Sequence, residues 1–231
     1  MILSRLKPLR LLSNRFRCHA ASAAAVSRHD TALWTPAPLI EVSAAAESLF
    51  HIAIDVSDSP ELAASYTTAG QYLQLLCRLQ KGDVVGLSAV MGKGFDVDRI
   101  SPPENYQTVL IFATGAGISP IRSLIEVGFG ADKRADVRLY YGARNLGRMA
   151  YQERFKDWES SGVNIVPVLS QPDESWKGER GFVQAAFARA KKILNPQSTG
   201  AVLCGHRQMA EDVSSILLSD GIMRERILKN I

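Results

Sequence analysis

Cysteine and histidine are scarce in this sequence. The 231 residues include three cysteines and four histidines. Cys18, Cys77 and Cys204 lie far apart, and the histidines show no spacing that is typical of metal ligands. A disulfide framework needs several paired cysteines, and a structural metal site needs closely spaced cysteine or histidine ligands. The sequence therefore predicts neither a disulfide-stabilised fold nor a metal site.

Acidic residues are absent from the first 29 positions. This leader, 1–29, contains six arginines or lysines, several serines and a run of small residues from Ala20 to Ala25. Such a composition is typical of an organelle transit peptide, and the leader lacks the apolar core of a secretory signal. The alternative is a basic tail without a targeting role. Composition does not separate a chloroplast address from a mitochondrial one.

The basic surplus is confined to the leader. The formal net charge is +4, yet six of the 27 basic residues precede residue 30 and all 23 acidic residues follow residue 29. A nucleic-acid-binding protein would need clustered basic residues on its folded part, so we expect no nucleic-acid partner. We also expect no membrane span, because no segment has 18 uninterrupted apolar residues.

The stretch 30–103 has short strand-like runs and frequent turn residues. An extended, proline-containing segment, 30–40, leads into it. Apolar runs then predict strands over 49–56, 71–79 and 83–90, separated by glycine-containing turns. We therefore predict a small all-β domain for this stretch.

The pattern changes after residue 103, where strand-like and helix-like segments alternate with short connections. The expected strands cover 109–113, 137–141, 163–169 and 201–204, and the expected helices cover 119–127, 151–160, 182–192 and 208–218. Such alternation is the signature of a parallel sheet covered by helices on both faces. We therefore predict an α/β domain over 104–231, with a doubly wound parallel sheet.

A glycine-rich turn follows the first of these strands. It consists of Thr114, Gly115, Ala116, Gly117, Ile118, Ser119 and Pro120. Glycines let the backbone approach a pyrophosphate closely, and the N-terminus of the next helix offers unpaired N–H groups. Ser119 is the expected N-cap of that helix, with Pro120 at its first position. The third glycine of the dinucleotide fingerprint is absent, so a plain strand-to-helix turn is the alternative.

The end of the fourth strand of this domain carries Cys204 and Gly205. Open parallel sheets bind ligands beyond the carboxyl ends of their strands, so this turn and the glycine turn are expected at the same edge. Cys204 is either a nicotinamide contact or a buried structural thiol. His206, which follows, is expected to begin a helix rather than to catalyse.

The second and third strands end in further candidates. Arg144 follows the second strand and is either a phosphate or ribose contact or an ordinary surface residue. Ser170 and Gln171 follow the third strand, where an NADPH site would place positive charge against the 2′-phosphate. Gln171 supplies no charge, and the nearby Lys177 and Arg180 are either such contacts or solvated surface residues. The balance slightly favours NADH.

Six short pieces of the sequence stand in an informative order. They are Gly70 to Tyr72, Gly92 to Phe95, Thr114 to Pro120, Tyr141 to Arg144 with Tyr151, Trp176 to Gly178 with Gly181 and Phe182, and Cys204 to Gly205 with Met209. Together they resemble the ferredoxin–NADP reductase superfamily, which includes cytochrome b5 reductase and flavin-linked electron-transfer subunits. The likeness runs from about Leu33 to the C-terminus and is strongest to plant FAD/NAD(P)-binding oxidoreductases.

The resemblance implies an oxidoreductase that transfers electrons between NAD(P)H and FAD and on to an acceptor that the sequence does not name. In that superfamily the glycine turn holds the pyrophosphate, the Cys-Gly turn lies beside the nicotinamide, and a hydride passes to the flavin N5. Tyr72 and Met209 are implied cofactor-binding residues. No catalytic acid or base is assigned, because hydride transfer to a flavin requires none. The plant likeness favours a chloroplast over a mitochondrion.

The stretch 30–103 departs from that superfamily. Its members hold the flavin with an Arg-x-Tyr-Ser/Thr motif on a six-stranded barrel, and no such motif occurs in this chain. Ile231 replaces the C-terminal aromatic residue of many members. Three strands cannot close a barrel, so we expect a shortened β-barrel flavin domain with unpaired edges. A nucleotide-binding module without catalysis, and a defective isoform, are therefore the alternatives to an active oxidoreductase.

Overall fold

The computed structural model describes residues 10–12, 34–47, 49–73, 75–76, 82–190 and 193–230. The chain divides into two compact units. The first unit comprises Met1–Thr67 and Gln71–Gly92, and the second comprises Thr68–Gly70 and Lys93–Ile231. The segment 93–103, expected in the first domain, is grouped with the second unit. Most of the leader, together with Cys18 and Cys77, lies outside the described residues.

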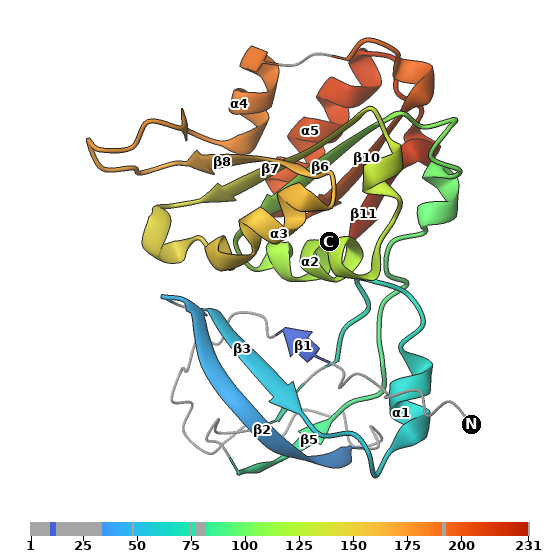
Figure 1. Cartoon of the computed structure of the whole chain (residues 1–231), viewed down its shortest axis with the longest axis vertical. Coiled ribbons are helices and arrows are strands. Elements are labelled where there is room, and N and C mark those ends of the chain that lie inside the picture. Colours follow the sequence, from blue (N-terminus) through green and yellow to red (C-terminus); the bar gives the residue numbers. More distant parts are fainter. Residues whose placement is uncertain are drawn as a thin grey trace. The chain divides into compact units, whose positions relative to one another are not determined.

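The first unit is built around one antiparallel sheet (Figure 1). Its strand order is β1-β3-β2-β5-β4, so β1 and β4 stand at the two ends and the described strands do not close into a barrel. The elements are β1 Arg10–Leu12, β2 Thr35–Ala46, β3 Leu49–Ile54, α1 Pro60–Ser65, β4 Leu75–Leu76 and β5 Val84–Leu87. Buried apolar side chains from β2, β3, α1 and β5 form its core.

The longest strand of this unit, β2, occupies much of the segment that was expected to be only an extended lead-in. Ala37 and Leu39 are buried while the residues between and beside them are exposed, as the period of two in a strand requires. Its prolines are tolerated because residues 35–38 pair with β5 alone, whereas residues 39–46 pair with β3.

Two other expectations for the first unit are wrong, and a third lies partly outside the described residues. Within the strand expected over 71–79, the described residues form an isolated bridge at Tyr72 and the two residues of β4, while 74 and 77–79 lie outside the described chain. The strand expected over 83–90 is shortened to β5. The unit is not all-β, because α1 begins at Pro60, and the fixed φ of proline suits the start of a helix.

The second unit contains a six-stranded sheet in which all neighbouring strands are parallel. The strand order is β11-β10-β6-β7-β8-β9. The strands are β6 Thr108–Thr114, β7 Asp136–Ala143, β8 Asn164–Leu169, β9 Glu179–Arg180, β10 Thr199–Cys204 and β11 Ile227–Asn230. The predicted doubly wound parallel sheet is confirmed. The structure adds β9 and β11, which are too short to show a pattern in the sequence.

Helices cover both faces of this sheet (Figure 1). The helices α2 and α3 lie on one face, and α4 and α5, which contact each other, lie on the opposite face. They are α2 Ile118–Val127, α3 Phe155–Ser160, α4 Val183–Ala190 and α5 Arg207–Ser219. Crossovers between parallel strands are right-handed, so strands added on opposite sides of β6 place their helices on opposite faces.

The sequence predicts a serine N-cap for the helix after the glycine turn, but the structure places the start of that helix elsewhere. Gly115–Gly117 form a 3-10 turn, and α2 starts at Ile118 with Gly117 as its N-cap. Ser119 therefore lies inside the first turn, where its side chain is buried and makes no cap hydrogen bond. Pro120 occupies the third helical position rather than the first. The tight 3-10 turn starts the helical path earlier than the residue types predict.

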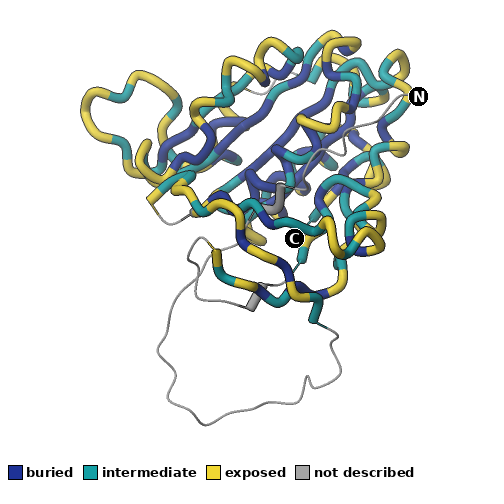
Figure 2. The backbone as a smooth tube through the Cα atoms, turned by 60° about the horizontal axis from the view of Figure 1, so that its bottom comes forward, coloured by how far each residue is buried: buried dark blue, intermediate teal, exposed yellow. Residues whose placement is uncertain are grey.

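The strands of the second unit are its most buried part, as Figure 2 shows. Phe112 on β6, Tyr140 on β7 and Phe187 on α4 form an aromatic cluster with ring centroids 5.0 to 5.5 Å apart. Stacked and edge-to-face rings at such distances stabilise a core beyond the burial of their area. This cluster fixes α4 on the sheet.

A buried arginine holds together the segments around the amino end of β6. The Arg134 guanidinium donates to the carbonyl oxygens of Tyr106 at 2.6 Å, Ile100 at 3.0 Å and Phe129 at 3.1 Å. Burial lowers the pKa of Arg134, and Glu104 opposes this change. Its cation is stabilised by backbone dipoles, so the segment before β6 is tied to the turn after α2.

Candidate functional site

The carboxyl ends of β6 and β10 lie side by side in the middle of the parallel sheet. Their register pairs Ala113 with Cys204. The chain leaves β6 through α2 toward one face, and it leaves β10 through α5 toward the other. Open parallel sheets bind ligands in the crevice that forms at such a change of direction. The two turns that follow β6 and β10 are therefore the candidate site.

These two turns are in direct contact. A Cβ added at Gly117 would lie 2.5 Å from the carbonyl carbon of Cys204 and 2.6 Å from Cα of Gly205. The backbone N–H of His206 donates to the hydroxyl of Thr114 at 2.8 Å. Gly117 is therefore required by the close approach of the β10 turn, a reason that the sequence did not reveal.

Gly115 presents the accessible part of the glycine turn. It is exposed, its φ is +54°, and no atom lies within 4 Å of the place where a Cβ would stand. The turn runs directly into α2, and the N–H of Ile118 already donates to carbonyls of the turn, so the N–H groups without an intrahelical partner are those at the start of the turn itself. Together with the helix dipole they make this turn suited to an anion such as a pyrophosphate.

The ends of β7 and β8 join the same edge. The N–H of Ser170 donates to the carbonyl of Ala143 at 3.0 Å, and the N–H of Gln171 donates to that of Arg144 at 2.8 Å. The side chains of Arg144 and Gln171 are exposed. Because β6 neighbours β7, the structure brings Arg144, Ser170 and Gln171 to the edge that carries the glycine turn.

Two predicted contact residues are buried. Cys204 is 5% exposed, and burial raises the pKa of its thiol to about 12, with the Gly205 N–H acting in the opposite direction. Met209 is 3% exposed and packs in the core cluster of the second unit. His206 begins α5 as expected, because its Nδ1 accepts the N–H of Gln208 at 3.3 Å.

Tyr72 belongs to the first unit. Its backbone exchanges hydrogen bonds with Met91 at 3.0 and 2.8 Å, and its side chain is 45% exposed. A Cβ at Gly92 would lie 3.0 Å from the ring of Tyr72, so the glycine leaves room for that ring. The result is an exposed aromatic surface with a fixed backbone.

Two further residues of the edge were not singled out from the sequence as site residues. Phe182 is 66% exposed between β9 and α4, at the carboxyl end of β9. Its position after Gly181, within one of the six pieces, was the available signal. Gly142 on β7 lies where a Cβ would be 2.7 Å from the side chain of Val183 and 3.1 Å from that of Thr114. Its small size reflects the packing of β7 against α4 and β6, which sequence alone does not show.

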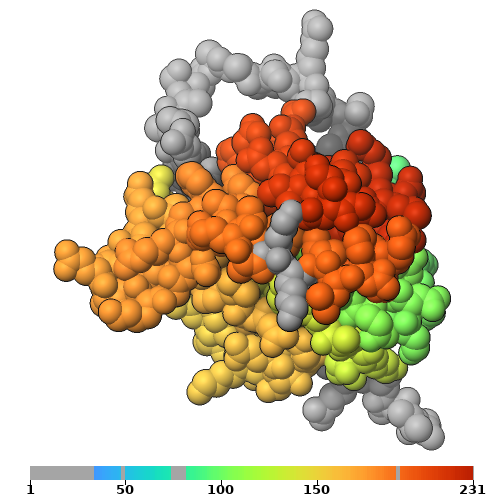
Figure 3. Space-filling view, turned by 90° about the horizontal axis from the view of Figure 1, so that it is seen from above, coloured from blue at the N-terminus to red at the C-terminus, as the bar shows by residue number. Residues whose placement is uncertain are grey.

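The connection between β8 and β9 projects from the second unit, as the orange atoms in Figure 3 show. It is held by its own hydrogen bonds. The Arg180 guanidinium donates to the carbonyls of Asp173 at 3.2 Å and Trp176 at 2.8 Å, and the Trp176 indole donates to the carbonyl of Glu179 at 2.9 Å. Arg180 thus stabilises the projecting segment.

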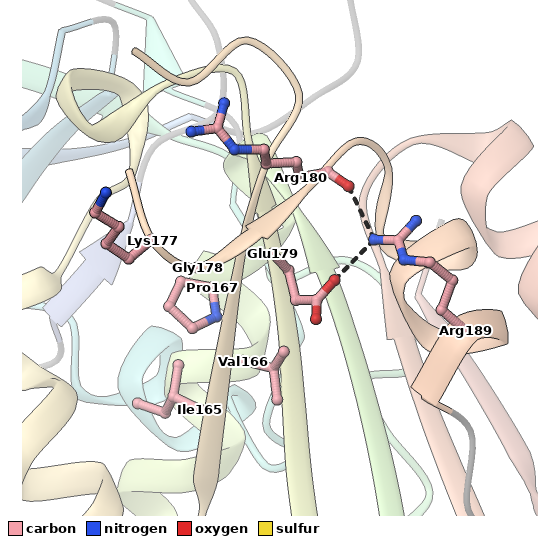
Figure 4. Close-up of a pocket in the computed structure, with 8 residues that line it drawn as sticks. All are labelled: Ile165, Val166, Pro167, Lys177, Gly178, Glu179, Arg180 and Arg189. Atoms are coloured by element: carbon pink, nitrogen blue, oxygen red, sulfur yellow. Dashed lines mark hydrogen bonds and ion pairs between the residues drawn. The ribbon is translucent and has the colours of Figure 1, made fainter. Parts of the chain in front are cut away.

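A hollow of about 620 Å³ lies beside this segment (Figure 4). It is lined by Ile165, Val166, Pro167, Lys177, Gly178, Glu179, Arg180 and Arg189. Arg189 forms an ion pair with Glu179 at 2.7 Å and donates to the Arg180 carbonyl at 2.9 Å. The β8 residues that line the hollow, Ile165, Val166 and Pro167, lie before the carboxyl end of that strand. The crevice lies beyond the strand ends, so the hollow is separate from it.

The described residues contain no group of three or more histidine, cysteine or acidic side chains that is arranged to hold a metal ion. Within the same part of the chain, no helix is both long and apolar enough to cross a bilayer.

The sequence is similar to a protein family and to known relatives. The family described as the oxidoreductase NAD-binding domain matches residues 111–215. The fruit protein pKIWI502 of Actinidia deliciosa is 44% identical over 247 aligned positions, which cover 87% of this chain and 78% of the relative. A chloroplastic ferredoxin–NADP reductase of Mesembryanthemum crystallinum is 26% identical over 164 positions, covering 64% of this chain but only 44% of the reductase.

A solved structure extends the likeness to the fold of both units. The cytochrome b5 reductase domain of Ulva prolifera nitrate reductase matches 85% of this chain and 97% of its own length, with a TM-score of 0.67 and 15% identity. At this identity the match concerns the fold alone. The fruit protein, by contrast, is similar in sequence across most of both chains. The chain therefore belongs to the ferredoxin–NADP reductase-like superfamily.

Proposed function

We propose that the second unit binds NAD(P)H in the crevice after β6 and β10, and that the chain is an oxidoreductase that passes electrons to FAD and on to an unidentified acceptor. The observation that carries this proposal is the contact between the two turns, secured by the hydrogen bond from His206 to Thr114. This contact places a helix end suited to an anion beside the end of β10, at the point where the strand order reverses. Reductases among the relatives support the assignment.

The residues of the crevice fit a nicotinamide nucleotide. Gly115 offers open backbone, and the start of the 3-10 turn that leads into α2 offers N–H groups, so the turn Thr114 to Pro120 would hold the pyrophosphate. Arg144 is an exposed cation at the neighbouring strand end and would add charge against a phosphate or ribose. The Cys204–Gly205 turn would border the nicotinamide with a neutral thiol. A bound nucleotide of this kind supplies a hydride for a flavin.

The strand end of β8 favours NADH over NADPH. Gln171 is exposed and uncharged, whereas a 2′-phosphate is held best by arginine or lysine. Arg180, the arginine at the end of β9, directs its guanidinium to the carbonyls of Asp173 and Trp176. One of its terminal nitrogens is thus engaged in stabilising the projecting segment.

The fit to a flavin is partial, so no step is assigned to a bound flavin. Tyr72 provides an exposed ring of the kind that stacks on flat heterocycles. The Arg-x-Tyr-Ser/Thr motif is absent, and the described strands of the first unit leave its sheet open. These two observations favour a second candidate function, in which the chain binds NAD(P)H without catalysing its oxidation.

An absorption spectrum of the purified full chain, recorded before and after NADH is added, tests the proposal. Flavin bands that bleach with NADH are the expected result. A colourless protein that still binds NADH would support the second candidate function. Failure to bind either nucleotide would overturn both. Arg144→Ala should weaken NADH binding, and Arg224→Ala, which removes an exposed arginine near β11, is the matched control.

We also propose that residues 1–29 direct the chain to the chloroplast and that 30–103 and 104–231 are the flavin-type and NAD(P)-binding domains. Chloroplastic reductases among the relatives support the plastid address. A fusion of 1–29 to a fluorescent protein should enter chloroplasts in plant cells. Fluorescence in mitochondria would indicate the other organelle, and cytosolic fluorescence would remove the targeting role.

A further inference from the structure

A cluster of buried polar side chains joins α2 to the segment after β7, and the proposed binding of NAD(P)H does not use it. The Arg122 guanidinium on α2 lies over the ring of Tyr151, with its central carbon 4.8 Å from the ring centroid. Its Nε donates to Glu126 at 2.7 Å. Ser119 stands one turn earlier on the same helix. Arg122, Tyr151 and Ser119 are 3%, 2% and 6% exposed.

Two neighbours, Glu126 and Tyr151, stabilise the buried charge of Arg122. Burial acts to lower the pKa of Arg122, but the Glu126 carboxylate and the Tyr151 hydroxyl together outweigh it and the pKa is raised, so the side chain stays charged. The face of the Tyr151 ring, which carries partial negative charge, contacts the cation in a desolvated setting, where such contacts are strongest. The guanidinium is therefore fixed between α2 and Tyr151.

The backbone of Tyr151 is strained. Its φ is +62°, and it is the non-glycine residue with a left-handed backbone among the described residues. Such a conformation is unfavourable for a residue with a Cβ and persists only where the surroundings enforce it. The contact with Arg122 is the feature that holds the ring in place on the α2 side. Strain of this kind points to a structural requirement at Tyr151 beyond filling space.

The hydroxyl groups of Ser119 and Tyr151 are both buried in this cluster, near each other and near the Arg122 guanidinium. Burial raises the pKa of the Tyr151 phenol, and the nearby Ser119 hydroxyl and Arg122 guanidinium oppose the rise. These buried polar groups therefore form one cluster that spans α2 and the segment after β7.

Tyr151 ends a segment that starts at Arg144 and is fixed at several points. The hydroxyl of Tyr141 accepts the N–H of Ala150 at 2.9 Å. The side-chain amide of Gln152 donates to the carbonyls of Leu146 at 3.0 Å and Met149 at 2.8 Å. The segment therefore behaves as a rigid piece whose far end is attached to α2 through Tyr151.

We propose that Arg122 and Tyr151 are positioning residues that hold the segment after β7 against α2, so that Arg144 and the glycine turn keep a fixed spacing for one nucleotide. This inference rests on the proposed binding of NAD(P)H. Arg122 and Tyr151 do not touch the nucleotide in this arrangement. They act through Arg144, because they fix the end of its segment to the helix whose N-terminus faces the pyrophosphate.

A double-mutant cycle on the full chain tests the inference, with the Kd for NADH and the Tm measured for each variant. Arg122→Met keeps the buried stem and removes the charge, and it should raise Kd about tenfold through lost preorganisation. Arg122→Lys retains a cation for Glu126 and should recover most of the affinity. In an Arg144→Ala background, Arg122→Met should change Kd by less than about twofold, because its effect passes through Arg144.

The controls separate positioning from general stability. Arg154→Met removes a nearby arginine whose ion pair with Asp157, at 3.7 Å, is exposed, and it should leave Kd unchanged. Should Arg122→Met fail to fold, Tyr151→Gly removes the ring while relieving the backbone strain, and the same pattern is expected.

Two outcomes would overturn the inference. One is a lower Tm without a change in Kd, and the other is an equal effect of Arg122→Met in both backgrounds. Absence of NADH binding by the unaltered chain would instead overturn the proposed function, and the inference with it.

Discussion

Replacing Gly117 with alanine is expected to force the two turns of the crevice apart. The new Cβ would stand 2.5 Å from the carbonyl carbon of Cys204 and 2.6 Å from Cα of Gly205, where ordinary contacts are 3.4–4 Å. Both neighbours are backbone atoms at the end of a central strand, so no flexible side chain can move aside. The glycine turn must shift by about 1 Å to restore normal packing.

The magnitude follows from two effects. Inserting a methyl group into a packed region costs about 1–3 kcal/mol. The shift also disrupts the hydrogen bond from His206 to Thr114, now 2.8 Å long, which contributes about 1 kcal/mol. The free energy of unfolding should therefore fall by about 2–4 kcal/mol, and Tm by roughly 5–15 °C for a unit of this size. NADH affinity should fall as well, because the helix end moves away from the second turn.

Gly115→Ala is the matched control for this prediction. Gly115 has φ +54°, so alanine there carries the cost of a left-handed backbone, about 1–2 kcal/mol, but it meets no atom within 4 Å. Thermal unfolding and NADH titration of both variants measure the difference. If Gly117→Ala unfolded at the temperature of the unaltered chain, or lost less stability than Gly115→Ala, the close approach of the turns would not explain this glycine.

The remaining predictions concern three single side chains. Gln171→Arg should raise the affinity for NADPH relative to NADH in competitive titrations; an unchanged ratio would mean that the end of β8 does not face the adenosine ribose. Cys204, with its pKa raised to about 12, should resist iodoacetamide at pH 8 until the chain unfolds, as peptide mass spectrometry can detect, and rapid labelling of the folded chain would contradict its burial. Because this pKa lies above the usual 9.0, the contribution of Cys204 to stability is present below pH 9 and is lost as the pH rises toward 12, a decline that Cys204→Ala should reduce. Arg134→Met should lower the free energy of unfolding by about 3 kcal/mol or more, since three carbonyls lose their donor, and a loss under 1 kcal/mol in urea unfolding would argue against that role.

The strands and helices of the second unit could be predicted because each has a hydrophobic pattern within its own residues. Long apolar strands such as β6, and amphipathic helices such as α5, repeat a pattern within a few residues of themselves. The first unit was harder to predict. Its strand β2 contains prolines and changes partners along its length, so the pairing that makes it a strand is not visible in its own residues. The start of α2 was also misplaced, because a 3-10 turn replaced the expected serine cap.

Local patterns in the sequence were enough to predict that a glycine turn, an arginine and a Cys-Gly pair stand at strand ends, since strand ends and turns are local features of the chain. The pairing of β10 with β6 was not predictable in this way, and it brings Gly117 against Cys204 and joins His206 to Thr114 across 92 positions. Parallel pairing is set by the crossover helices and by core packing between distant segments. The same long-range packing buries Arg122 against Tyr151, a contact that neither residue's sequence neighbours indicate.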